Sequence, residues 1–356
     1  MKKLLFVLVS GLILLAGCTS SKDQTIKIGW IGPLTGQSAV LGIDSITAAQ
    51  IAVDEINNAG GVNGRLLQLF AEDDQYSTRQ TLSAYEKLVN QNGVKAILIQ
   101  TYGGVFALAE RAKKDGIVLL DTLDCNSKLV AASEAVFCLA TDSDSLADVL
   151  AGHANKNFKK VGLIVFNSDA FMPYIKDRFL ETYTGESVVE MYPAETTDFR
   201  SILLKMKAVD ALVLLGYDET GTAMKQARDL GMAVPFLTTG TVTSPSLQSA
   251  AQGNAEGTHF AFWTISKNDD AKRFDDTFLA MKNRPPILDL ATYPTYEGVK
   301  FIAYALQNSD APLGQALLNV QDFTGITSVK NMAPDRSVRI PESLFVLKEG
   351  KPVKVE

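Results

Sequence analysis

The feature that most constrains the fold is an alternation of strand-like and helix-like segments that occurs twice along the chain. The first series begins with "IKIGWIG" at residue 26 and ends near residue 142. A second series begins with "KKVGLIVFNS" at residue 159. The strands are continuous apolar runs, which are typical of parallel sheets covered by helices on both faces. Two such series predict two doubly wound α/β lobes.

The first 24 residues are expected to lie outside these lobes. Lys2 and Lys3 precede an apolar run from Leu4 to Leu15, which is too short to span a membrane and has the length of the apolar part of a signal peptide. The sequence "LAGC" then resembles the lipobox of bacterial lipoproteins. We predict a signal peptide over residues 1–17 and a lipidated linker over 18–24, with Cys18 as the membrane anchor. An ordinary secretory leader with an incidental cysteine is the alternative.

The charge balance excludes some classes of partner. Two of the 34 basic residues lie in the leader, so 32 remain against 40 acidic ones. This acidic balance argues against binding to nucleic acid or to a membrane through a polybasic surface. About 335 residues follow the leader, which is more than one hydrophobic core usually holds.

Two further cysteines, Cys125 and Cys138, remain after the leader. Outside the cytosol an even pair of cysteines suggests a disulfide. The alternative is a pair of buried thiols that behave as small apolar side chains.

Motifs typical of enzymes do not occur in the sequence. The two histidines, His153 and His259, are far apart, and the HExxH, CxxC, GxSxG and GxxxxGK[ST] patterns are missing. Asp121 and Asp124 could form an acid–base pair, but no nucleophile or metal-ligand cluster accompanies them. We therefore expect a binding protein with no metal and no cofactor.

Side chains suited to binding fall at the carboxyl ends of the predicted strands, where doubly wound sheets bind their ligands. They include several aromatic rings, hydroxyls and backbone N–H groups and few charges, as in small-molecule sites. The residues are Tyr102, Gly103, Asp121 to Cys125, Phe171, Tyr217, and Thr239 to Thr241.

The motifs "GPLTG", "AVDEINNAGGVNG" and "EDDQ", at the spacing found here, resemble the opening of the bacterial branched-chain amino acid-binding proteins. The likeness continues through "VGLIVFNSDAF", "DALVLLGY" and "AEGTHF" to "TGITSVKNMAPDRSV". These proteins are extracytoplasmic receptors of ABC importers with the type I periplasmic-binding-protein fold.

The resemblance implies two lobes joined by three crossings of the chain. The first lobe would comprise residues 25–142 and 268–324, and the second residues 143–267 and 325–356. The lobes would close on a small solute, and the closed monomer would dock on the permease subunits of the transporter. Lipid on Cys18 would keep the receptor on the membrane near its transporter.

The resemblance also assigns residues to the ligand's carboxylate side. Tyr102, with Gly103 and Gly104 beside it, matches a serine that helps to hold the ligand carboxylate. Leu123 and Cys125 match a small residue and a threonine that help to hold the ligand's charged ends.

On the ammonium side the sequence departs from the family pattern. Gly240, which precedes Thr241, matches a glutamate that pairs with the ligand ammonium. Because an unpaired buried ammonium is costly, an ordinary α-amino acid is not the expected ligand. Asp124 or Asp121 could replace the missing charge, which would make the protein an atypical amino acid receptor.

The remaining matched positions favour an apolar ligand. Phe171 and Tyr217 match two aromatic contacts, and no arginine falls at a strand end. An aromatic or apolar carboxylate, held by backbone N–H groups, is therefore the preferred ligand class. Trp30 could add flat apolar surface, but core packing is the preferred interpretation because it alternates with Ile28 along its strand. Trp263 and Tyr296 are interpreted as core or hinge residues.

Two other functions stay open. A lipoprotein of the same fold could sense a ligand and regulate a membrane partner instead of feeding a transporter. An enzyme that uses Asp121 and Asp124 is the less favoured alternative.

Overall fold

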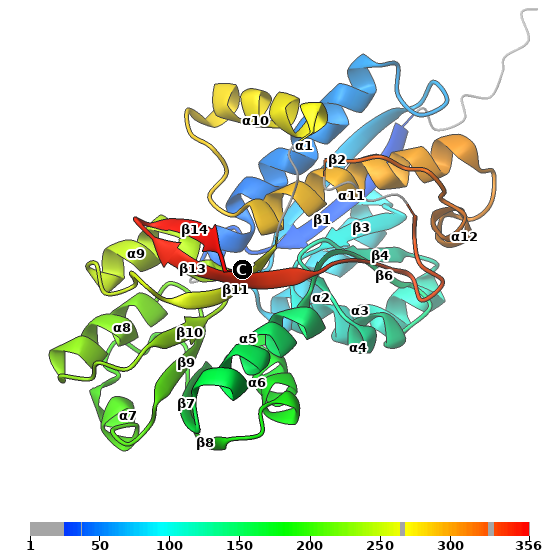
Figure 1. Cartoon of the computed structure of the whole chain (residues 1–356). Helices are drawn as coiled ribbons and strands as arrows, with labels where there is room; N and C mark the ends of the chain where they lie inside the picture. The colour runs from blue at the N-terminus through cyan, green and yellow to red at the C-terminus, as the bar shows by residue number, and fades with distance from the viewer. Residues whose placement is uncertain (1–24, 37, 264–267, 327–330, 356) are drawn as a thin grey trace, which may run out of the picture.

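The computed structural model describes residues 25–36, 38–263, 268–326 and 331–355 (Figure 1). The chain forms two α/β lobes, each built around a sheet of seven strands. This arrangement confirms the predicted fold class. The predicted signal peptide and the predicted lipidation at Cys18 lie outside the described residues.

The sheet of the first lobe is entirely parallel and follows the order β12-β6-β4-β3-β1-β2, with the short β5 paired to β6. Its strands are β1 (Thr25–Gly32), β2 (Leu66–Asp73), β3 (Ala96–Ile99), β4 (Val118–Asp121), β5 (Asp124–Cys125), β6 (Val136–Asp142) and β12 (Ser337–Ile340). Its helices are η1 (Ala39–Leu41), α1 (Ile43–Asn58), α2 (Thr78–Glu86), η2 (Lys87–Asn92), α3 (Tyr102–Asp115), α4 (Ser127–Ala131), α10 (Asp269–Lys282), α11 (Asp289–Asn308) and α12 (Leu313–Leu318).

The second sheet repeats the arrangement and adds an antiparallel edge, in the order β14-β13-β11-β10-β9-β7-β8. Its strands are β7 (Lys160–Phe166), β8 (Glu186–Tyr192), β9 (Ala211–Leu215), β10 (Phe236–Thr238), β11 (His259–Trp263), β13 (Glu342–Lys348) and β14 (Lys351–Lys354). Its helices are α5 (Ser143–Asn157), α6 (Phe171–Thr182), α7 (Arg200–Lys205), α8 (Thr220–Asp229), η3 (Gly240–Thr243) and α9 (Pro245–Ala251).

The C-terminal segment corrects the predicted lobe boundary. Residues 325–356 were all expected in the second lobe, but β12 pairs in parallel with β6 at the edge of the first sheet. The chain then passes through Pro341 and continues as β13, which pairs antiparallel with β11 in the second sheet. The crossing between the lobes therefore lies at Pro341, because the backbone groups of β12 complete the first sheet.

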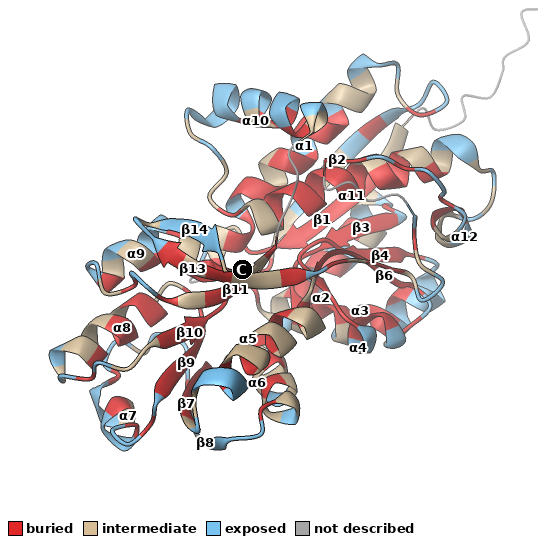
Figure 2. Cartoon of the chain, in the orientation of Figure 1, coloured by how far each residue is buried: buried red, intermediate tan, exposed pale blue. Residues whose placement is uncertain are grey.

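The apolar strands are buried and the outer helix faces are exposed (Figure 2). Helix α11 packs along α1 and covers one face of the first sheet. Trp30 and Tyr296 lie in the hydrophobic core of this lobe, and Trp263, at the end of β11 of the second sheet, packs into the same core. Because helices cover the faces of both sheets, the strand ends between the lobes are the place left for a ligand site.

Candidate ligand-binding site

A cavity of about 40 Å³ lies between the two lobes, where the carboxyl ends of their strands meet. Most of its wall is apolar or aromatic, and two carboxyl groups also reach it. Among the described residues, those that line it include no lysine, arginine or histidine. The lining residues are Leu41, Tyr76, Leu123, Asp124, Thr141, Leu146, Phe171, Met172, Tyr217, Thr239, Gly240, Thr241, Leu290 and Glu342.

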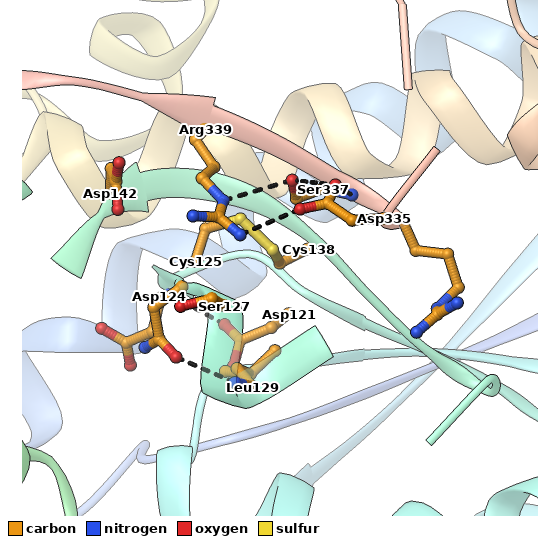
Figure 3. The surroundings of a disulfide bond; sticks show 12 residues. Asp121, Asp124, Cys125, Ser127, Leu129, Cys138, Asp142, Asp335, Ser337 and Arg339 are labelled. Carbon is orange, nitrogen blue, oxygen red and sulfur yellow. Dashed lines mark hydrogen bonds and ion pairs between the residues drawn. A yellow bond between two sulfur atoms is a disulfide. The ribbon is translucent and has the colours of Figure 1, made fainter. Parts of the chain in front are cut away.

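On the first-lobe side, a tight turn after β4 presents Leu123 and Asp124. The backbone N–H groups of both residues donate to Oδ1 of Asp121, each at 2.8 Å. A disulfide between Cys125 and Cys138, with 5.3 Å between the Cα atoms, ties the end of this turn to β6 (Figure 3). Asp121 therefore shapes the turn, and the disulfide anchors it next to Asp124.

On the second-lobe side, Asp169 positions two of the aromatic and apolar walls. Its Oδ1 accepts hydrogen bonds from the backbone N–H groups of Phe171 at 2.9 Å and Met172 at 3.1 Å. Its Oδ2 accepts one from the hydroxyl of Tyr217 at 2.6 Å. One half-buried aspartate thus fixes the start of α6 and the Tyr217 ring together.

Asp124 and Glu342 are the two acidic residues of the cavity wall. They are 3% and 7% exposed, and Oδ2 of Asp124 and Oε2 of Glu342 have no hydrogen-bond partner in the part of the chain that the structure describes. The hydroxyl of Ser143 hydrogen-bonds Asp124, and that of Thr141 hydrogen-bonds Glu342. Each carboxyl group therefore has one buried oxygen whose capacity to accept a hydrogen bond is unused among the described residues.

Burial changes the protonation of these acids. Desolvation raises the pKa of Glu342 to about 8. It also raises the pKa of Asp124 well above its usual value, with further contributions from the negative charges of Asp121, Asp169 and Glu342. A carboxyl group in a low-dielectric site is disfavoured in its charged form unless a cation accompanies it.

Arg339 is close in sequence to Glu342 but is occupied elsewhere. Its guanidinium donates to Oδ2 of Asp335 at 2.9 Å and to the hydroxyl of Ser337 at 3.2 Å (Figure 3). It also lies 3.7 Å from a carboxylate oxygen of Asp144. Arg339 therefore turns toward other acids and is not a residue of the cavity wall.

The structure brings six of the ten predicted ligand-binding positions to the cavity. They are Leu123, Asp124, Phe171, Tyr217, Gly240 and Thr241. Whether they contact a ligand stays a prediction.

The other four predicted positions do not line this cavity. The Tyr102 ring is buried against Phe171 and Tyr174 of the second lobe, each with its ring centroid 5.5 Å away. Gly103 and Gly104 lie against α2, because a Cβ atom on them would meet Thr78 and Thr81 at 2.5 and 2.6 Å.

Cys125 is the fourth of these positions. Its sulfur is bonded to Cys138, so it cannot serve as the hydrogen-bonding counterpart of the family's threonine. Its role in the structure is to hold the turn that carries Asp124.

The packing around Gly240 explains why a glutamate does not fit there. A Cβ atom at this position would lie 2.7 Å from Cδ2 of Phe262 and 3.0 Å from Cδ2 of Leu290. Leu290 comes from α11 and also lines the cavity. The space of the missing side chain is thus occupied by apolar atoms, and the acidic groups enter from other elements.

Several cavity residues were not predicted from the sequence. Tyr76 follows the carboxyl end of β2 and could have been found by the same rule that found Tyr217. Glu342 and Leu290 gave no such signal, because Glu342 opens the antiparallel strand β13 and Leu290 lies in the first turn of α11.

Metal-binding clusters and membrane-spanning helices are both absent from the part of the chain that the structure describes. The described His, Cys, Asp and Glu residues form no group of three or more that could hold a metal ion. Within the same residues, helices long and apolar enough to cross a bilayer are also absent.

Comparison with known protein families gives one match over most of the chain. Residues 25–337 match the family model described as periplasmic binding protein. The "Leu/Ile/Val-binding protein homolog 3" of Brucella melitensis is 27% identical over 304 residues, which are 82% of each chain. The Leu/Ile/Val-binding protein of Escherichia coli K12 is 24% identical and aligns with 85% of this chain and 87% of its own.

Solved structures show the same architecture. The branched-chain amino acid transporter substrate-binding protein LivJ of Streptococcus pneumoniae, in complex with isoleucine, has a TM-score of 0.83 and 28% identity, covering 92% of this chain and 97% of LivJ. A solute-binding protein of an ABC transporter from R. palustris, in complex with 4-hydroxybenzoate, has a TM-score of 0.80 and 19% identity, covering 93% and 96%. At that identity the second likeness concerns the fold alone.

Proposed function

Because the chain belongs to the periplasmic binding protein family, we propose that it is the extracytoplasmic receptor of an ABC importer and binds a small organic solute between its lobes. The observation that carries the proposal is the cavity between the strand ends, whose wall is built from both lobes. Relatives described as binding proteins of ABC transporters, with isoleucine or 4-hydroxybenzoate bound, support it.

The cavity wall supports an apolar body for the ligand. Aliphatic side chains from both lobes and the rings of Tyr76, Phe171 and Tyr217 face the cavity. Burying an aliphatic or aromatic group there gains about 25 cal/mol for each Å² removed from water. The proposed ligand therefore keeps the apolar body that the sequence predicts.

The wall gives no support to the predicted carboxylate. A buried carboxylate needs a cation or several N–H donors, and the described residues that line the cavity carry no cationic side chain. Asp124 and Glu342 offer no positive charge, and in their ionised form they would repel an anionic ligand.

The cellular arrangement is proposed from the leader. Lipid on Cys18 would hold a monomeric receptor at the outer face of the cytoplasmic membrane or in the periplasm, within reach of its permease. Mass spectrometry of the protein isolated from its own cells tests the anchor, since a diacylglyceryl group on Cys18 is the expected result and an unmodified cysteine would contradict it.

The solute-binding function is tested by a thermal-shift screen of the protein spanning residues 25–356. The compounds are amino acids, amines, aliphatic acids and aromatic acids. A ligand present at 100 times its Kd adds about 2.7 kcal/mol to the free energy of unfolding, so a true ligand raises the Tm by a few degrees. If none of these classes changes the Tm at millimolar concentration, the proposed function is wrong.

A further inference from the structure

We infer that the ligand carries an ammonium group and that this group binds between Asp124 of the first lobe and Glu342 of the second. The inference rests on the proposed function and deepens it by naming the charged part of the ligand.

The first support is geometric. Asp124 lies in β5 of the first sheet and Glu342 opens β13 of the second sheet, yet both line the same cavity. Each is more than nine-tenths buried and has one oxygen without a partner among the described residues. Two acceptors from opposite lobes therefore face one cavity.

The second support is the lack of compensation for these acids. Buried polar groups are nearly always hydrogen-bonded, and buried charges are nearly always paired. The residues whose charges act on Asp124 are Asp121, Asp169 and Glu342, and the one that acts on Glu342 is Asp142. All of them are acidic, so none of these neighbours compensates an ionised Asp124 or Glu342, whereas a cationic ligand would.

An organic ammonium fits this site better than a metal ion. Ammonium has three N–H donors, which can serve the orphan oxygens of Asp124 and Glu342 and a neighbouring hydroxyl such as that of Thr141. Calcium takes six to eight oxygen ligands, whereas the rest of this wall is mainly aliphatic and aromatic. The apolar wall would hold the body of the amine.

The placement of the two acids also couples binding to closure of the lobes. Without a cation, two carboxylates from opposite lobes that enter one water-poor cavity either repel each other or must take up protons, and both cost free energy. An ammonium between them turns that repulsion into attraction. Glu342 follows Pro341 directly, so the group that senses the ligand charge sits at a crossing between the lobes.

The test compares probes that share an apolar body and differ in their charged groups. One set is 3-methylbutylamine, leucine and 4-methylpentanoate, and the other is 2-phenylethylamine, phenylalanine and 3-phenylpropanoate. Isothermal titration and thermal shift are measured at pH 7 on residues 25–356. We expect at least one amine or amino acid to bind and neither acid to bind.

Variants test whether the two acids receive the ammonium. Glu342→Gln and Asp124→Asn are each expected to weaken the ammonium probe by about tenfold or more, since hydrogen bonds to charged groups contribute about 1.5–3 kcal/mol. Glu134→Gln is the matched control, because the Glu134 side chain is 76% exposed and pairs with Lys113. Circular dichroism and the Tm of each ligand-free variant show that it is folded.

The outcomes separate the inference from the function on which it rests. Binding of only the acids, or of none of the six probes, overturns the inference, as does an affinity unchanged in both Glu342→Gln and Asp124→Asn. If a compound without a cationic nitrogen binds in the wider screen, the receptor function stands and the inference fails. If no compound in that screen binds, the receptor function itself fails.

Discussion

At the scale of single residues, two aspartates build the cavity without lining it. Asp121 holds the turn that carries Asp124, and Asp169 holds Phe171 and Tyr217. Each accepts two backbone N–H groups, so each fixes a short segment of main chain at the end of a strand. Their role is positional, because they hold in place the residues that line the cavity.

The raised pKa of Glu342 predicts how the stability of the ligand-free protein depends on pH. Its pKa is about 8 in the folded protein and 4.5 in the unfolded chain, so the folded state binds more protons between these values. Stability therefore falls as pH rises through this window. Between pH 6.5 and 8 we expect a decrease of about 1–2 kcal/mol, measured by urea unfolding.

Titration of the two histidines does not account for the expected decrease in stability between pH 6.5 and 8. Burial lowers the pKa of His153 to about 4, and that of His259 is also lowered. Both therefore cost stability only as pH falls below the unfolded value of 6.5. Glu342→Gln should reduce the slope between pH 6.5 and 8, whereas wild-type stability that is flat or rises there would contradict a buried, uncompensated acid.

At the scale of secondary-structure elements, the disulfide joins the two-residue strand β5 to its neighbour β6. A strand this short has few backbone hydrogen bonds of its own, so the covalent link holds the turn after β4 in place. Cys125 and Cys138 are 13 residues apart in the sequence, which is a short loop for a cross-link.

Removing this disulfide should cost both stability and affinity. We expect the double variant Cys125→Ala, Cys138→Ala to lose about 2–4 kcal/mol of unfolding free energy, measured by urea unfolding. Its affinity for the ligand should also fall, because Asp124 adjoins Cys125. Wild-type protein with the disulfide reduced is the control, and equal stability of all three forms would argue against this structural role.

The strand-and-helix alternation was sufficient to predict both lobes, because continuous apolar strands and glycine-ended helices are local signals. It also placed Asp124 and Tyr217 at the site, since both follow strand ends. It could not place Glu342, which reaches the cavity only through the pairing of β13 with β11 across a long sequence separation. Nor could it show that Tyr102 is not among the residues lining the cavity, because the position of this ring depends on rings of the other lobe.

At the scale of the whole molecule, contacts between aromatic rings hold the two lobes together beside the cavity. Tyr102 of the first lobe contacts Phe171 and Tyr174 of the second. Tyr76 and Tyr217 form a second contact between the lobes, with ring centroids 5.9 Å apart. Such pairs contribute about 0.5–1.5 kcal/mol each beyond the area that they bury.

Tyr102→Leu should therefore weaken ligand binding by favouring separation of the lobes. With the two ring pairs between the lobes lost, we expect a decrease in affinity of about 5- to 150-fold, measured by isothermal titration. Phe106→Leu is the matched control, because Phe106 contacts Tyr102 from within the same helix at 5.0 Å. Equal losses in the two variants would mean that the contact between the lobes is not what matters.

The central claim is that a small organic solute binds in the cavity between the lobes. The most direct measurement is a crystal structure of residues 25–356 with the compound that raises the Tm most in the screen. The account predicts electron density for that compound against Leu123, Phe171 and Tyr217. Density for the compound at any other place on the protein, with this cavity unchanged, would contradict it.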